Sequence, residues 1–251
     1  MKVSWHLIRE HVLARAVRSD EEAAADPRLA EEARRNRFSI TSLCAADGLG
    51  KVFCGCTNRS GDILYEFDLG AKRFRSLGFD RIAEPCDAKI HRGLWLDRQR
   101  NSLYFGIATL SPIGQYVTGP GARIMRFDLG TEKYEELARP APGNYIQATA
   151  YDARRQLMYS FTLPGLGFAV SELATGRTRW NVPLESIVHV PAIDPAGGVW
   201  GTHSINLQAF FRYDPDADRF EFPEGCAMPT AVKASNVMYT GAGPVDCMLA
   251  G

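Results

Sequence analysis

The stretch IHRGLWLDRQRNSLYFGIAT, residues 90–109, decides how the rest of the chain is interpreted. Apolar and polar residues alternate, a charged turn opens at Asp97, and a second alternating run follows. Alternation with a period of two predicts β-strands, and the polar turn between the runs predicts a hairpin. The same pattern recurs along the chain. Its turn acids are Asp47, Asp97, Asp152 and Asp194.

A second hairpin follows each of these, in which an aromatic residue opens the return strand. The four copies are ILYEFDLGAKRFRSL (63–77), RIMRFDLGTEKYEEL (123–137), GFAVSELATGRTRW (167–180) and AFFRYDPDADRFEF (209–222). Each repeat therefore has four predicted strands. The turn acids are 50, 55 and 42 residues apart, close to the period of about 40–50 residues that is typical of propeller blades. The sequence predicts an all-β protein, a β-propeller with four four-stranded blades.

The two ends of the chain differ from the repeats. Residues 1–37 have helical spacing of apolar residues and predict a helical lead-in, so we expect the propeller to occupy residues 38–251. The stretch VDCMLAG (245–251) resembles the opening strand of a fifth repeat. Four blades and one extra strand do not close neatly, so we expect a piece of a propeller with six or seven blades. The alternative is a four-bladed ring with residues 234–251 as an added strand or tail.

Charge and composition do not indicate a binding partner. Lys and Arg number 29, and so do Asp and Glu, which argues against nucleic acid or an acidic membrane surface as the partner. Because the chain has neither an apolar run long enough for a membrane helix nor the pattern of a signal peptide, we expect a cytoplasmic protein.

The six cysteines predict reduced, mostly buried thiols. Cys54-Gly-Cys56 lacks the two-residue spacing usual for metal or redox pairs.

One position of each predicted innermost strand is polar in an otherwise apolar run. Counting five residues back from the turn position gives Ser42, Arg92, Gln147, His189 and Asp246. If the first strands line a central channel, these side chains form a ring there. The ring has two interpretations, a wet channel wall satisfied by water or a ligand-binding site.

Catalytic roles can be assigned to three members of the ring. Arg92 could clamp a carboxylate or phosphate, His189 could act as general acid or base, and Asp246 could orient it. His203 is expected near His189 at the channel mouth as a further ligand-binding residue. His91 would point to the opposite face from Arg92 if its strand is regular.

No metal site is predicted, and the sequence leaves any cofactor unknown. A metal held by the two histidines would need a third donor, such as Asp246 or Asp87. The insertion LSPIGQYVTGPGA (110–122) is longer than an ordinary hairpin loop and is the candidate for a binding loop.

The pattern AxxxDxxxxxLYFG…FDLxxxxYExL, covering about residues 38–251, resembles the propellers of the YVTN and SMP-30-like superfamily and also the virginiamycin B lyase fold. The resemblance implies blade architecture rather than one activity. The first functional hypothesis is a ligand-binding or scaffolding module that contacts a small molecule or protein through the channel mouth and the 110–122 insertion. The alternative is a lyase or hydrolase acting on a sugar acid, lactone or cyclic peptide, so whether the chain is an enzyme stays open.

Overall fold

The computed structural model describes residues 39–58, 61–110, 121–140, 145–186, 188–203, 209–224 and Met248. Within these ranges the chain is all-β and its strands pair antiparallel, as predicted. The predicted helical lead-in at 1–37 lies outside the described residues. So do 111–120 of the insertion and, except for Met248, the stretch 245–251.

The described strands fall into four groups of four, which we call units 1 to 4. Unit 1 contains β1 (Ser39–Ala46), β2 (Lys51–Thr57), β3 (Leu64–Asp68) and β4 (Arg73–Ser76). Unit 2 contains β5 (Asp87–Asp97), β6 (Ser102–Thr109), β7 (Ile124–Asp128) and β8 (Lys133–Ala138), and the 3-10 turn η1 (Phe79–Arg81) precedes it. Unit 3 contains β9 (Tyr145–Asp152), β10 (Leu157–Leu163), β11 (Gly167–Glu172) and β12 (Thr178–Pro183). Unit 4 contains β13 (Ala192–Ile193), β14 (Val199–His203), β15 (Ala209–Asp214) and β16 (Arg219–Glu221).

Most of these strands lie within a few residues of the predicted ones, but the first strand of unit 4 does not. The strand that ends at the turn acid Asp194 was expected to include His189, whereas β13 comprises only Ala192 and Ile193. Pro191 explains the difference, because proline has no amide hydrogen to donate to a neighbouring strand. His189 consequently lies in a bend before the strand and not in the sheet.

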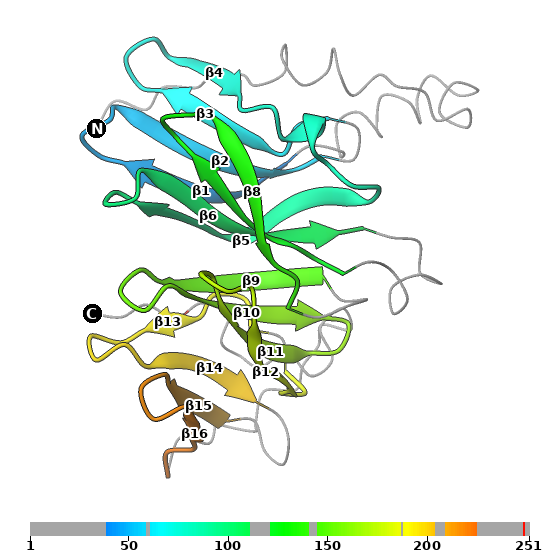
Figure 1. Ribbon diagram of the computed structural model, residues 1–251, viewed down its shortest axis with the longest axis vertical. Helices are drawn as coiled ribbons and strands as arrows, with labels where there is room; N and C mark the ends of the chain where they lie inside the picture. The colour runs from blue at the N-terminus through cyan, green and yellow to red at the C-terminus, as the bar shows by residue number, and fades with distance from the viewer. Residues whose placement is uncertain are drawn as a thin grey trace, which may run out of the picture.

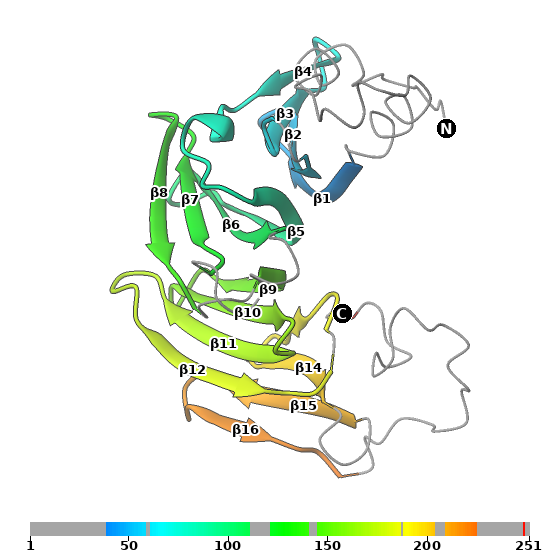
Figure 2. The same cartoon turned by 90° about the vertical axis from the view of Figure 1, so that its right-hand side faces the viewer.

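Within each unit every strand pairs with the next one along the chain. Units 1 and 2 join into one eight-stranded sheet through a single pair of residues, Thr57 and Lys89. The first strands of successive units contact one another in the series β1, β5, β9, β13. Figure 1 shows units 1 and 2 above units 3 and 4. In Figure 2 the units fan along an arc, with β1, β5 and β9 on its concave side and β8, β12 and β16 on its outer side. This arrangement is propeller-like.

Apolar side chains from adjacent units form the core between them. Representative residues are Phe53, Leu94 and Phe105 between units 1 and 2, Tyr104, Ile146 and Met158 between units 2 and 3, and Tyr159, Phe168 and Phe211 between units 3 and 4. Burying each such large side chain contributes about 1.5–3 kcal/mol. Among the aromatic residues of the strands, Tyr104, Phe105, Tyr159 and Phe211 are buried, while Trp95, Trp200 and Phe210 are partly exposed.

Two of the turn acids fold their hairpins in the same way. Asp97 accepts hydrogen bonds from the backbone N–H of Arg100 at 3.0 Å and from its guanidinium at 2.8 Å. Asp152 and Arg155 repeat the arrangement at 3.0 and 2.7 Å. Arg155 also reaches unit 4, where its Nε donates to Asp216 at 2.7 Å. The turn acids therefore organise the hairpins and, through arginine, connect neighbouring units.

The Cys54-Gly-Cys56 segment is a pair of buried free thiols. Burial raises the pKa of Cys54 to about 11 and raises the pKa of Cys56 further. Both sulfurs stay protonated at neutral pH, so neither is an activated nucleophile or a ready metal ligand.

Over the ranges that the structure describes, no helix has the length and apolar character needed to cross a bilayer.

The inner strands of units 2 and 3 approach closely at Gly93. A Cβ atom added there would lie 1.9 Å from Oγ1 of Thr149 and 3.0 Å from the Thr149 backbone nitrogen. Only a residue without a side chain fits between β5 and β9 at this point.

We predict that Gly93→Ala lowers the free energy of unfolding by about 1–3 kcal/mol, because the added methyl group overpacks the contact between β5 and β9. Urea unfolding followed by circular dichroism measures the change. Gly130→Ala is the matched control, since its Cβ would meet only Asn101 and Asp128 side-chain atoms at 3.4 and 3.5 Å. Equal stability of the two variants would contradict the prediction.

Candidate functional site at the inner strands

Three side-chain hydrogen bonds join the inner strands of units 2 and 3. The pairs are His91 with Gln147 at 3.1 Å, Trp95 with Thr149 at 2.9 Å, and Asp97 with Tyr151 at 2.7 Å. The partners on β9 are alternate residues, so they share one face of the strand and all point toward β5. We call this row of bonds the β5–β9 seam. Gln147, one of the predicted ring residues, thus lies between two units.

The seam begins at an irregularity in β5. The register with β6 shifts between Ile90 and Leu94, and Arg92 has a φ of 48°, in the left-handed region. Such a bulge breaks the alternation of a strand and redirects its side chains. The strand is therefore not regular. The sequence analysis placed His91 on the opposite face from Arg92 only for a regular strand. Instead, His91 hydrogen-bonds Gln147, the residue predicted to share the ring with Arg92.

Unit 1 supports this bulge. The hydroxyls of Thr41 and Ser42 both donate to the carbonyl oxygen of Ile90, at 2.6 and 3.2 Å. Gly55 is required beside them, because a Cβ there would lie 2.2 Å from the Ser42 hydroxyl. Ser42 was predicted as a ligand-binding residue, and the structure places its hydroxyl on the backbone of the neighbouring unit.

The hydrogen bonds of Gln147 define the tautomer of His91. The amide oxygen Oε1 accepts from Tyr145 at 3.1 Å and lies 3.1 Å from Nδ1 of His91. Because a carbonyl oxygen only accepts, Nδ1 carries the hydrogen and Nε2 carries a lone pair. His91 thus presents an acceptor at Nε2.

Positive charge gathers around His91. Burial, with the charges of Lys89 and Arg92, lowers the pKa of His91 to about 3, and His189 acts in the same direction. Burial and the charge of Arg92 also lower the pKa of Lys89. We call Lys89, His91, Arg92, Gln147 and His189 the axis cluster. Of the predicted ring residues, Gln147 hydrogen-bonds His91, and the charges of Arg92 and His189 act on the pKa of His91.

The nearest acidic side chain on β5 is already engaged elsewhere. Asp87 forms a buried ion pair with Arg123, and Arg123 also lies 4.0 Å from Glu84. Among the described residues, no carboxylate forms an ion pair with Lys89.

The remaining predicted site residues lie elsewhere or outside the described ranges. His203, at the end of β14, packs edge-on against Phe222 with ring centroids 5.2 Å apart, and burial lowers its pKa. Asp246 lies outside the described residues, so the catalytic arrangement of Arg92, His189 and Asp246 stays a prediction. Within the described ranges, no group of three His, Cys, Asp or Glu side chains could hold a metal ion.

A pocket of about 770 Å³ lies among residues of units 2, 3 and 4. Unit 2 contributes Trp95, unit 3 contributes residues 150–155, and unit 4 with the bend before it contributes residues 190–197; Met248 completes the lining. We call this the Trp95 pocket. Its volume is within the range of about 300–1,000 Å³ that is typical of small-molecule sites.

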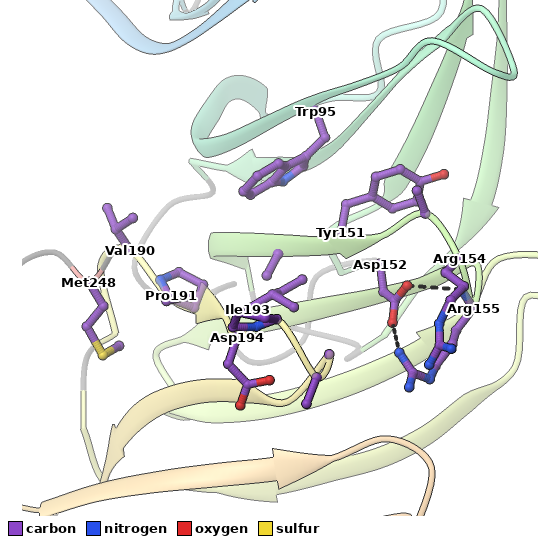
Figure 3. A pocket seen from close by; sticks show the side chains of 16 residues that line it. Trp95, Tyr151, Asp152, Arg154, Arg155, Val190, Pro191, Ile193, Asp194 and Met248 are labelled. Atoms are coloured by element: carbon purple, nitrogen blue, oxygen red, sulfur yellow. Dashed lines mark hydrogen bonds and ion pairs between the residues drawn. The ribbon is translucent and has the colours of Figure 1, made fainter. Parts of the chain in front are cut away.

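The pocket has an apolar end and a polar end. In Figure 3, Trp95 lies across from Pro191 and Ile193, with Val190 and Met248 at one end. Asp152, Arg154 and Arg155 lie at the other end. The backbone N–H of Met248 donates to the carbonyl of Val190 at 3.1 Å, which fixes the apolar end.

The carboxylates that line the pocket already have cationic partners. Asp152 pairs with Arg155 at 2.7 Å, and Asp194 accepts from Arg212 at 2.7 Å and from the indole of Trp200 at 2.9 Å. Burial acts to raise the pKa of Asp194, but these hydrogen bonds hold it at about 2. The polar end of the pocket is thus internally compensated.

No protein-family model and no curated protein matches the sequence. Three solved structures resemble the chain in part. A crystal structure of a nidogen/laminin complex has 14% identity over 77% of this chain and 67% of that chain, with a TM-score of 0.49. The computationally designed Ika8 protein has 15% identity over 69% of this chain and 46% of its own, with a TM-score of 0.45. A structural genomics protein of unknown function from Bacteroides thetaiotaomicron VPI-5482 has 11% identity over 74% of this chain and 47% of its own, with a TM-score of 0.47. At these TM-scores the likenesses carry no argument about fold or function.

We predict that the protonation of His91 lowers the free energy of unfolding as the pH falls. Its pKa is about 3 in the folded chain but near 6.5 when unfolded. Between these values the unfolded chain binds the extra proton, so stability is lost as pH falls from about 6.5 toward 3, by at most about 1.4 kcal/mol per pH unit. Urea unfolding at pH 7, 6 and 5 should show a shallower loss in His91→Gln than in the parent protein. Identical slopes would contradict the assignment.

Proposed function

We propose that this chain is a propeller-like binding module and that a small molecule occupies the Trp95 pocket. The observation that carries the proposal is the pocket itself, about 770 Å³ in volume and walled by three units. Clefts where several rigid elements meet are common ligand sites, because the scaffold holds the contacting side chains in place. Trp95 supplies a flat apolar surface whose position is fixed by its hydrogen bond to Thr149.

The proposal also covers the blade architecture and a second kind of contact. Each four-stranded unit would be one propeller blade, with β1, β5, β9 and β13 lining the axis. The sequence resemblance to YVTN and SMP-30-like propellers supports this interpretation. Contact with a protein through the channel mouth and the 110–122 insertion is the scaffolding form of the proposal.

The proposal predicts that N-phenyl-1-naphthylamine, a neutral aromatic probe, binds the Trp95 pocket with an increase in its fluorescence. Ala196 is exposed and lines the pocket, so Ala196→Trp places an indole in the binding volume without disturbing a buried position. We expect this variant to weaken probe binding about tenfold or more, a loss of about 1.4 kcal/mol.

The matched control is Ala71→Trp, at an exposed alanine in the β3–β4 turn that does not line the pocket. It should bind the probe like the parent protein. The proposal is wrong if the probe does not bind, or if both tryptophan variants bind it equally well.

A further inference from the structure

We infer that the ligand of the Trp95 pocket is an uncharged molecule with a flat aromatic ring system, and that this ring system lies against the indole of Trp95. This inference rests on the proposed function and names the class of ligand. It draws on three features of the lining: where the space arises, which surface Trp95 presents, and how the charges are paired.

The space in the pocket arises at equivalent positions of three units. Trp95 of β5, Ala150 of β9 and Ala192 of β13 all line the pocket. Each of the three is paired with an aromatic residue of the next strand, respectively Tyr104, Tyr159 and Trp200. Because alanine is small, units 3 and 4 leave open the space that an indole fills in unit 2. A ring of the ligand takes up this space.

Trp95 presents its ring system to the ligand and no hydrogen-bonding group. Its indole Nε1 donates to the hydroxyl of Thr149 at 2.9 Å, and an indole has only this one donor. In Figure 3, Trp95 lies across from Pro191 and Ile193. Aromatic pairs stabilise a contact beyond the apolar area that they bury. An aromatic ligand between these walls therefore gains more from Trp95 than a saturated ligand of the same shape.

The charges of the lining cancel and are already paired. The lining contains two aspartates and two arginines. Each of the four lies at ion-pair distance from a group of opposite charge: Asp152 with Arg155 at 2.7 Å, Asp194 with Arg212 at 2.7 Å, and Arg154 with Asp216 at 3.5 Å. A charged group on the ligand would lose hydration without gaining an unpaired counter-ion, which is unfavourable.

Arg154 does not change this conclusion. Its side chain is 72% exposed, and ion pairs at such exposed places contribute little because water and salt screen them. An anion therefore gains little from Arg154 in return for entering the pocket. An uncharged ligand avoids the loss of hydration altogether.

The first experiment compares three compounds that share a naphthalene ring. 2-Naphthamide is uncharged, 2-naphthoate is an anion, and 2-naphthylmethylammonium is a cation at pH 7. Displacement of N-phenyl-1-naphthylamine from the parent protein measures the affinity of each. We expect 2-naphthamide to bind about tenfold more tightly than either ion, a difference of about 1.4 kcal/mol. Added salt should leave the affinity of 2-naphthamide unchanged.

The second experiment tests the aromatic contact. Decahydro-2-naphthamide has the carbon skeleton of 2-naphthamide without its aromatic electrons. The ratio of the two affinities, 2-naphthamide over the saturated compound, should fall about threefold or more in Trp95→Leu. Trp95→Phe keeps an aromatic ring and should retain most of the ratio. Using a ratio removes the difference in hydrophobicity between the two compounds.

The matched control is Trp180→Leu. Trp180 lies on β12 outside the lining and, like Trp95, donates its indole N–H to a side chain, that of Asp218 at 2.8 Å. This variant should keep the ratio of the parent protein. Circular dichroism melting checks that the variants are folded. The comparison of charges needs no variant at Trp95, so it decides the inference even if Trp95→Leu does not fold.

The outcomes separate this inference from the proposed function. If Ala196→Trp binds N-phenyl-1-naphthylamine like the parent protein, the proposed function fails. If Ala196→Trp weakens that binding but either ion competes as well as 2-naphthamide, the pocket stands and the inference of an uncharged ligand is overturned. The aromatic contact is overturned if Trp95→Leu and the parent protein have the same ratio.

Discussion

The close contact between β5 and β9 is the constraint on which the rest of the structure depends. The two strands belong to different units, and three side-chain hydrogen bonds cross between them at alternate residues of β9. Gly93 permits the approach, and Gly106 does the same on β6, where a Cβ would lie 2.6 Å from Ile146. Because this contact fixes where Trp95 and His91 lie, both the pocket and the axis cluster follow from it.

Side-chain hydrogen bonds from the later strands of units 2 and 3 also join neighbouring parts of the chain. Tyr134 of unit 2 donates to the carbonyl of Leu77 at 3.0 Å, and Trp180 of unit 3 donates to Asp218 of unit 4 at 2.8 Å. Both are aromatic residues that open a return strand in the sequence repeat. In these two repeats the polar atom of the aromatic residue bonds outside its own unit, Tyr134 to the segment that follows unit 1 and Trp180 to unit 4.

The sequence predicted the strands well, because alternation and turn residues are local signals. Asp97 and Asp152 marked hairpins that the structure confirms. The sequence analysis did not predict that β13 is so short, although Pro191 interrupts the apolar run before it. The bulge at Arg92 was also missed, and a glycine inside a strand pattern, Gly93, was the available signal.

The candidate site was harder to predict than the fold. A register rule selected Arg92, Gln147 and His189, but it could not select His91, because the bulge in β5 breaks the alternation on which the rule depends and His91 bonds to Gln147 of β9. No pattern in the sequence indicates the pocket. Its walls come from three units, so it exists only through tertiary packing.

The two hydroxyls on the Ile90 carbonyl have a consequence for recognition at the axis. Thr41 and Ser42 of unit 1 hold the backbone of unit 2 in place immediately before His91. A backbone that is pre-organised in this way loses little conformational entropy on binding. Recognition at this place would therefore depend on the fit of a partner to a rigid backbone rather than on rearrangement of the protein.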